Sequence, residues 1–351
     1  MSRAVTLASS LSWVAFLVTL PLWMNDLYFL HVLIITGIFI VAAMSLNLLL
    51  GYTGQLSLGH VAFFGIGAYV SSLVSLGFEI HVWGETTVSL EPKPVWLAML
   101  VAVMFAGLCG FMIGKISFKV RGAYFVIVSV SFAEVTRLVA LNWLELTQGP
   151  MALNNIPYLK LGIPGVGQID FIGKLPNYYL VLGVAILTYV IIRRLVRSRA
   201  GRAMIALREN EPLATSVGID VTRFLVLATV VSAGLAGLAG AVYAHYVRIV
   251  DPDVFLFIYT VTMVIMVVTG GKGTLAGPIV GGLIFGILPE VLRGFEVMPE
   301  IQWVVYGVLM ILIVYFLPEG IVPALRDAWR RWAGRSGTPP ARPTVVVEAQ
   351  P

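Results

Sequence analysis

Long apolar runs dominate this chain, and short polar segments separate them. Ten runs approach or exceed the roughly 20 apolar residues that a helix needs to cross the hydrocarbon of a bilayer. They cover residues 6–24, 27–50, 61–78, 95–114, 122–143, 177–192, 225–247, 254–270, 274–292 and 301–318. Runs such as Val261–Val268 lack the alternation of polar and apolar positions that strands of a transmembrane barrel show. The pattern predicts an all-α, polytopic transmembrane helix bundle of about ten spans.

The composition agrees with a membrane protein. Of the 351 residues, 59% are hydrophobic and 12% are charged, against about 45–50% and 25% in soluble proteins. One water-soluble core cannot hide that excess of apolar residues. Only Glu134, Arg137 and Glu290 place a charge inside the runs, and the single cysteine, Cys109, excludes a disulfide scaffold.

Basic residues are distributed unevenly around these runs. If the N-terminus is cytoplasmic and the runs alternate, 17 basic residues lie on the cytoplasmic side and five lie outside. This excess matches the positive-inside rule, so both termini are expected in the cytoplasm. Insertion and attraction to anionic membrane lipid account for the net charge of +5, and no nucleic-acid partner is expected.

The two ends of the chain carry further expectations. In the first run, Pro21, Trp23 and Met24 stand where a signal peptide would have small residues for cleavage, so we expect a retained span. Residues 1–322 are predicted to form one transmembrane domain, with a long cytoplasmic loop at 193–224. Residues 323–351 include a proline-rich segment and are predicted to form a disordered cytoplasmic tail.

The segment between the second and third runs has an unusual composition. Residues 51–60 read Gly-Tyr-Thr-Gly-Gln-Leu-Ser-Leu-Gly-His and carry no formal charge. Non-helical backbone at membrane depth is tolerated only against protein or water, and transporters place broken helices along the substrate path. A plain cytoplasmic loop followed by glycines for close helix packing is the alternative. The pathway hypothesis names Gly54, Gln55, Ser57 and Gly59.

Glu134 and Arg137 are three residues apart within one apolar run. At that spacing both side chains share a helix face and can form an ion pair. Ionisable residues inside a membrane are costly and usually serve a function, so this pair is a second candidate for the pathway. A structural pair that only orients the helix is the alternative.

The polar segment 193–224 is long enough to form a helix that lies on the membrane. Its apolar residues Met204, Ile205 and Leu207 follow helical spacing, and a helix stop is expected at Gly218. A projecting helix of this kind offers a surface to a cytoplasmic partner. A solvated, positively charged loop is the alternative.

The sequence lacks the motifs of enzymes that act within membranes or on nucleotides. None of the four histidines begins a zinc-protease motif, and no run contains an aspartate for an aspartyl dyad. The turn Gly270–Thr274 lacks the Ser or Thr that directly follows the lysine of a phosphate-binding loop. We therefore expect no catalytic residue, no metal site and no cofactor in this chain.

Four distinctive blocks follow one another along most of residues 40–322. They comprise Leu46–His60 with Phe63–Tyr69, Arg121–Phe125 with Phe132–Leu138 and Ala140–Trp143, Gly201–Gly218 with Ser232–Tyr243, and Gly270–Pro278 with Leu288–Glu290 and Phe316–Gly320. In this order they resemble the permease subunits of branched-chain amino acid ATP-binding-cassette (ABC) importers, of the LivM type.

The resemblance implies a type II ABC importer-like fold, a bacterial inner-membrane location and inward transport. Such a permease pairs with a second, homologous permease and with two ABC ATPase subunits, which bind ATP and Mg²⁺. A periplasmic substrate-binding protein delivers the branched-chain amino acid. The helix that docks on the ATPase would carry over to Gly201, Arg202, Arg208, Glu209, Asn210, Glu211, Ala214 and Gly218.

Departures from the family pattern leave alternatives open. Glu211, Ala214 and Gly218 approximate the importer pattern of Glu-Ala-Ala followed by Gly, with the glutamate one position off. Relatives often have Thr-Gly-Gly in an outer loop where this chain reads Thr147–Asn154, which opens urea, short amides or aromatic acids as substrates. An ion-coupled secondary transporter, with Glu134 as its acidic residue, is the remaining rival.

Overall fold

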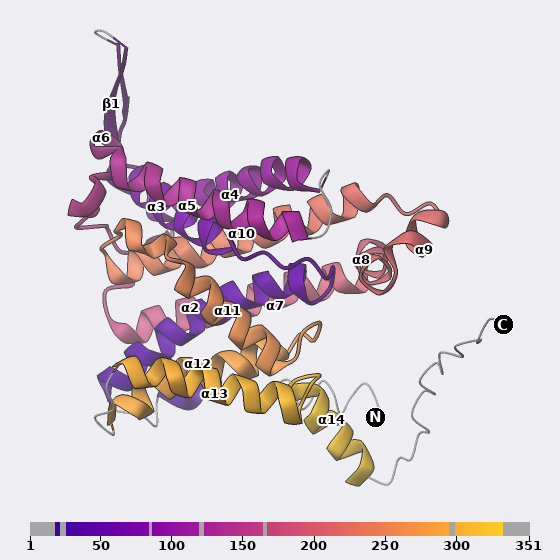
Figure 1. Cartoon of the computed structure of the whole chain (residues 1–351). Helices are drawn as coiled ribbons and strands as arrows, with labels where there is room; N and C mark the ends of the chain where they lie inside the picture. The colour runs from indigo at the N-terminus through magenta and orange to yellow at the C-terminus, as the bar shows by residue number, and fades with distance from the viewer. Residues whose placement is uncertain are drawn as a thin grey trace, which may run out of the picture.

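The computed structural model describes residues 18–21, 26–83, 86–118, 123–163, 167–294 and 299–332. Its helices are α2 (Leu27–Leu50), α3 (Val61–Leu76), α4 (Val95–Ser117), α5 (Ala123–Asn142), α6 (Leu144–Thr147), α7 (Lys174–Arg197), α8 (Arg199–Glu209), α9 (Glu211–Ser216), α10 (Val221–Val247), α11 (Phe257–Gly270), α12 (Gly277–Gly294), α13 (Pro299–Phe316) and α14 (Ile321–Trp332). Two 3₁₀ turns, η1 (Gly149–Met151) and η2 (Pro252–Phe255), lie in the loops. The long helices run side by side between two ends of the molecule (Figure 1).

The helices bear out a polytopic membrane protein. Within the described ranges, six helices are long and apolar enough to cross a membrane, and α3 and α11 are shorter apolar helices. Nine of the ten predicted runs each coincide with one helix. Of the run 6–24, only the helical residues 18–21 lie within the described part. The total of ten spans stays a prediction.

Two helices form the centre of the bundle, because α2 and α10 are mostly buried against their neighbours. Glycines allow α3 and α10 to touch backbone to backbone. A Cβ atom added at Gly67 would lie 2.1 Å from the carbonyl oxygen of Gly237, and one at Gly240 would lie 1.8 Å from that of Phe64. Small residues at helix crossings are the usual means of close approach in membranes, where apolar burial does not distinguish protein from lipid.

The expectation of an all-α fold is wrong in two loops. Strands β1 (Phe78–Trp83) and β2 (Thr86–Leu90) form an antiparallel hairpin, as do β3 (Lys160–Ile163) and β4 (Gly167–Asp170). The β1–β2 hairpin projects well beyond the helices (Figure 1). Its alternation of apolar and polar residues, with several β-branched ones, favours strands once the segment has left the apolar runs.

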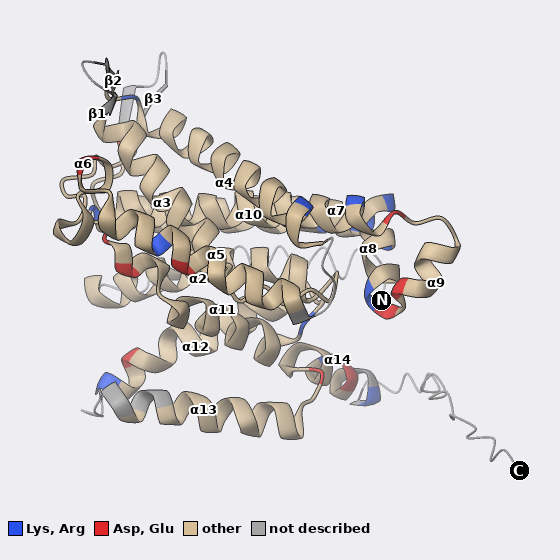
Figure 2. Ribbon diagram, turned by 45° about the horizontal axis from the view of Figure 1, so that its top comes forward, with Lys and Arg blue, Asp and Glu red and all other residues tan. Residues whose placement is uncertain are grey.

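The expectation of a disordered tail from residue 323 is also wrong at its start. Helix α14 extends to Trp332, because apolar and charged residues in this segment alternate with helical periodicity. Residues 333–351 lie outside the described part. Charged side chains gather on α8, α9 and α14, which share one end of the bundle, opposite the β1–β2 hairpin (Figure 2).

Candidate functional site

The segment 51–60 leaves α2 and returns into the bundle without forming a helix. Gly54 has a φ of +75°, a backbone conformation that glycine adopts without strain, and residues 55–58 have no regular structure. Helix α3 begins only at Val61 and has 16 residues, fewer than the roughly 20 that a full crossing needs. This geometry fits the predicted interruption between two membrane helices. We call residues 51–60 the broken helix.

Hydrogen bonds hold residues 58–61 against three helices of the bundle, α5, α11 and α2. The backbone N–H groups of Leu58 and Gly59 donate to Ser129 Oγ on α5, at 3.1 and 3.3 Å. The N–H of Val61 donates to Thr260 Oγ1 on α11 at 3.1 Å, so the two short helices α3 and α11 meet where both begin. His60 is fully buried, and its Nε2 lies 2.8 Å from Ser45 Oγ on α2. These partners satisfy backbone groups that lipid could not.

The four predicted residues of this segment have different surroundings. Gly54 is exposed, Gln55 is half-buried, and Ser57 and Gly59 are buried. A Cβ atom at Gly59 would lie 1.6 Å from the carbonyl oxygen of Ser129, so only glycine permits this contact with α5. Gly59 therefore shapes the site through its backbone.

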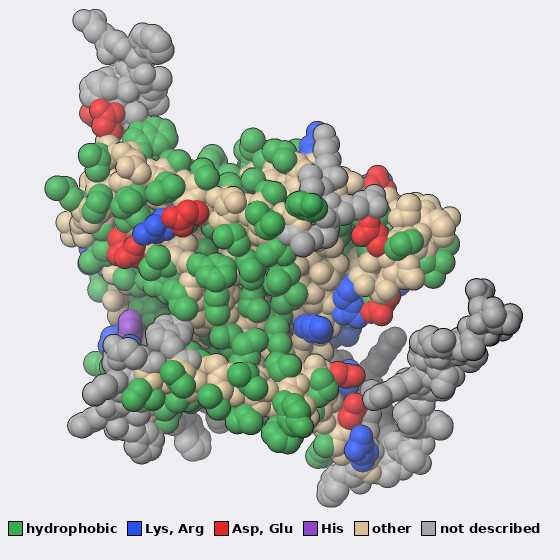
Figure 3. All heavy atoms as spheres, in the orientation of Figure 1, with side chains coloured by type: hydrophobic (Ala, Val, Ile, Leu, Met, Phe, Trp, Pro, Cys, Tyr) green, Lys and Arg blue, Asp and Glu red, His purple; other side chains and the backbone are tan. Residues whose placement is uncertain are grey.

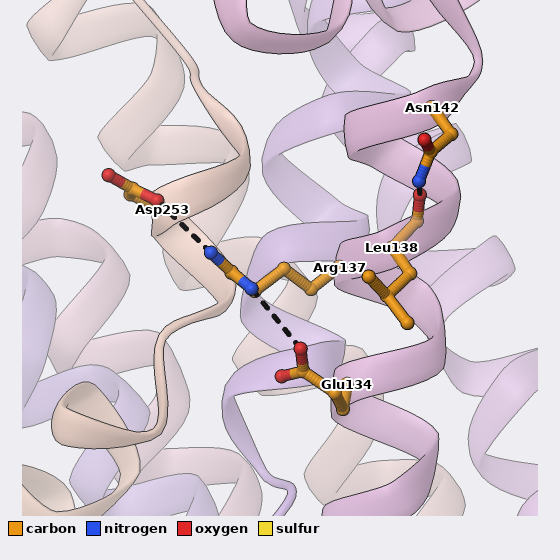
Figure 4. A network of polar contacts seen from close by, with 5 residues as sticks. All are labelled: Glu134, Arg137, Leu138, Asn142 and Asp253. Atoms are coloured by element: carbon orange, nitrogen blue, oxygen red, sulfur yellow. Dashed lines mark hydrogen bonds and ion pairs between the residues drawn. The ribbon is translucent and has the colours of Figure 1, made fainter.

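Glu134 and Arg137 form the predicted ion pair, with 3.1 Å between Arg137 Nη1 and Glu134 Oε1. Arg137 Nη2 also lies 3.7 Å from Asp253 Oδ1 in η2, a partner that the sequence analysis missed (Figure 4). The side chains of Glu134 and Asp253 are 56% and 65% exposed, and that of Arg137 is 24% exposed. We call these three residues the charged triad.

The charged triad interrupts an otherwise apolar face of the molecule (Figure 3). Exposed apolar side chains on α5 and α11 include Val135, Leu138, Val139 and Phe257. The pair lies on this open face of the chain, whereas an intramembrane pair usually faces a bundle interior. Insertion experiments put the cost of an Arg or Asp facing lipid at the membrane centre at about 2.5–3.5 kcal/mol.

The helix predicted in the loop 193–224 forms as two short helices, α8 and α9, that meet at Asn210. Met204 and Leu207 are buried, as their spacing predicts. Asn210 Oδ1 accepts a hydrogen bond from Leu213 N at 3.0 Å and so caps α9. The predicted stop at Gly218 is confirmed: its φ is +86°, and Ile219 N donates to Ala214 O across it. We call α8, α9 and Gly218 the coupling segment.

The predicted docking residues divide between the two sides of the coupling segment. Gly201 and Ala214 are buried against the bundle, so they support the segment. Arg202, Arg208, Glu209, Asn210 and Gly218 are exposed, and Glu211 is half-buried. Apart from Gly218, these outward-facing predicted residues are polar or charged.

Two apolar residues of the coupling segment escaped the sequence analysis. Leu213 and Val217 are 63% and 71% exposed, and they lie four residues apart on one face. Their spacing within a polar loop was a readable signal of an apolar patch. Exposed apolar side chains that lie together offer a contact surface for another protein or for lipid.

Among the described residues, no group of three or more His, Cys, Asp or Glu side chains is placed to hold a metal ion. The candidate site consists of residues 51–60 against α5, the charged triad on α5 and η2, and the coupling segment at one end of the bundle. That architecture is that of a polytopic helical membrane protein.

Comparison with known proteins specifies the class. The family described as branched-chain amino acid transport system / permease component matches residues 28–314, and the chain belongs to this family. It is 30% identical to the high-affinity branched-chain amino acid transport permease LivM of Salmonella typhimurium, over 86% of this chain and 71% of that protein. It is 26% identical to the permease LivH of the same organism, over 80% of this chain and 89% of that protein. No solved structure matches the chain.

A more distant relative matches over nearly the whole of its own length. The probable branched-chain amino acid transport permease LivM of Methanocaldococcus jannaschii is 25% identical, over 82% of this chain and 91% of that protein. The matched region contains both the charged triad and the coupling segment. The protein is thus a membrane-embedded permease component.

Proposed function

We propose that this chain is one of two permease subunits of an ABC importer for branched-chain amino acids in a bacterial inner membrane. Two ATPase subunits bind the cytoplasmic end, and a periplasmic binding protein delivers the amino acid to the opposite end. Both termini lie in the cytoplasm. ATP closes the ATPase dimer, and the permeases alternate between outward and inward openings because ATP binds the closed state more tightly.

The coupling segment is the observation that carries this proposal. It places exposed Leu213 and Val217 beside charged residues at the same end as α14. The basic residues of this end are those that the positive-inside rule assigns to the cytoplasm. A helix that exposes an apolar pair beside charged residues offers a contact surface for a partner protein, and in an importer of this class that partner is the ATPase.

A second permease subunit explains why the charged triad lies on an open face of this chain. Glu134 and Arg137 lie in the second half of α5 and Asp253 lies in η2; charges that face lipid are costly, so the face that carries them borders water or protein. We propose that this face lines the pathway between the two permeases. The similarity of this chain to both LivM and LivH supports a pair of homologous subunits with related faces.

Reconstitution tests the importer. The chain is co-expressed with a homologous permease, the two ATPases and the binding protein from the same genome, purified through a tag on this chain and placed in proteoliposomes. Uptake of labelled leucine that requires ATP and binding protein, and that vanadate stops, supports the proposal. Leucine uptake by this chain alone, sensitive to an uncoupler and insensitive to vanadate, refutes it in favour of an ion-coupled carrier. Competition by urea, acetamide or benzoate defines the substrate.

The charged triad has a separate test in the same vesicles. Glu134→Gln keeps the side-chain size and Arg137→Gln shortens the side chain; each removes one charge, and we expect leucine uptake to fall at least fivefold. Glu145→Gln on exposed α6 is the matched control. Unchanged uptake in Glu134→Gln and Arg137→Gln would refute a role of the charged triad in the pathway. Unchanged uptake in Gln55→Ala would refute the same role for Gln55.

A further inference from the structure

Arg208 occupies a junction between three segments that are far apart in the sequence. It projects from α8, and its Nη1 donates to the carbonyl oxygen of Gly51 at 2.6 Å. A Cβ atom at Gly54 would lie 3.1 Å from Arg208 Cγ, and one at Gly273 would lie 2.6 Å from Arg208 Nη1. The aliphatic stem and the guanidinium group therefore contact the start of the broken helix and the α11–α12 turn at once.

The same junction is closed on its other side by Asn47. Asn47 Oδ1 accepts from Gly273 N at 2.9 Å, and Asn47 Nδ2 donates to Thr274 O at 2.8 Å. The α11–α12 turn is thereby tied to the last turn of α2. Movement of α8 relative to this junction has to act on the chain at Gly51, because Arg208 bonds to that carbonyl directly.

From Gly51 the contacts continue to the charged triad. The chain passes through Gly54 to Gly59, whose backbone touches Ser129 on α5 without room for a Cβ atom. Ser129 lies five residues before Glu134 on the same helix. A displacement at Gly51 therefore reaches α5 through the close backbone contact of Gly59 with Ser129, because packed interiors transmit strain.

We infer that Arg208 is a positioning residue that transmits movement of the coupling segment to the broken helix and so to α5. Arg208 also forms an ion pair with Glu209, which orients the guanidinium group next to the docking surface. The side chain is thus shared between the outer side of α8 and the interior of the permease. An arginine suits this role because several donors in one rigid plane can hold two partners together.

This inference rests on the proposed function and is tested in the complete reconstituted importer. The measured quantity is the number of leucine molecules taken up per ATP hydrolysed, with binding protein present. We expect Arg208→Gln to lower this ratio at least tenfold and Arg208→Lys to restore part of it, since lysine keeps one donor for Gly51 O. Arg199→Gln is the matched control, because Arg199 is an exposed arginine at the start of the same helix.

A distance measurement provides a readout that a docking contact alone would not change. Spin labels at Leu100→Cys on α4 and Val135→Cys on α5, both exposed positions, with Cys109→Ser, report the separation of α5 from α4. We expect ATP with vanadate to change this separation in the unaltered coupling segment and to leave it unchanged with Arg208→Gln, while the ATPases still copurify.

The outcomes separate the possible failures. An unchanged uptake ratio in Arg208→Gln, or an ATP-dependent distance change that persists in it, overturns the inference. Loss of the ATPases from the purified Arg208→Gln complex also overturns it, because Arg208 would then act only in docking. Absence of ATP-driven uptake with no substitution at all is the failure of the proposed function.

Discussion

The contact of Gly59 with α5 leads to a quantitative prediction. In Gly59→Ala the new Cβ atom would lie 1.6 Å from the carbonyl oxygen of Ser129, whereas ordinary van der Waals contact begins at 3.4 Å. Neither the new Cβ atom nor the backbone carbonyl of Ser129 can rotate away. The broken helix and α5 therefore have to separate by about 2 Å. That separation breaks the hydrogen bonds that Leu58 N and Gly59 N donate to Ser129 Oγ.

A buried donor left without its acceptor costs about 1–3 kcal/mol, so the two together cost about 2–6 kcal/mol. Ser129→Ala removes the same acceptor without a clash and is expected to cost less, because the segment can stay in place. A loss of this size lowers an unfolding midpoint by several degrees or more, about 2–4 °C per kcal/mol in domains of 150–250 residues.

The single cysteine supplies the assay. Cys109 on α4 is half-buried, so a thiol-reactive fluorophore reports its exposure as the detergent-solubilised chain is heated. The matched control is Gly183→Ala, since nothing lies within 4 Å of a Cβ atom at Gly183. We expect the midpoints to rank Gly183→Ala above Ser129→Ala and Ser129→Ala above Gly59→Ala. A Gly59→Ala midpoint equal to that of Gly183→Ala would refute the backbone contact.

Three further predictions concern surfaces and strain. Leu213→Glu combined with Val217→Glu should abolish copurification of the ATPases while the second permease still copurifies; retention of the ATPases would contradict a docking role. Leu325→Glu combined with Trp329→Glu should release α14 from the bilayer surface, because these exposed side chains form the apolar face of an amphipathic helix that also carries exposed Arg326 and Arg331. Spin labels at residue 328 should become more accessible to a water-soluble relaxation agent, and equal accessibility would contradict this prediction. Gln148→Gly should raise the unfolding midpoint or leave it unchanged, since Gln148 has a φ of +58° that costs a non-glycine residue about 1–2 kcal/mol; a clear drop would show that its side chain matters more than its backbone.

Local patterns carried the prediction of the membrane helices and of the ion pair. Apolar runs decide which segments enter a bilayer, because each backbone group there has to be satisfied within the segment itself. Glu134 and Arg137 lie three residues apart on one helix, so their contact follows from helix geometry alone. The stop at Gly218 is equally local, since a left-handed residue ends a helix wherever glycine offers it.

The elements that differ from the predictions have weaker periodicities. The hairpin β1–β2 and helix α14 both follow patterns present in the sequence, with periods of two and of about 3.6 residues. Leu213 and Val217 were visible in the same way, four residues apart in a polar loop. These features are short, and the strong apolar runs beside them dominated the interpretation.

By itself, the sequence determined the membrane class, the helical segments, the family blocks and the contacts between residues up to four positions apart. Tertiary structure alone decided the partnership of Arg137 with Asp253, 116 positions later, and that of Arg208 with Gly51, 157 positions earlier. It also placed Gly59 against Ser129 and brought the starts of α3 and α11 together. Local rules extend one helical turn, whereas these contacts depend on how whole helices cross, and that crossing is set by many small packing contacts acting together.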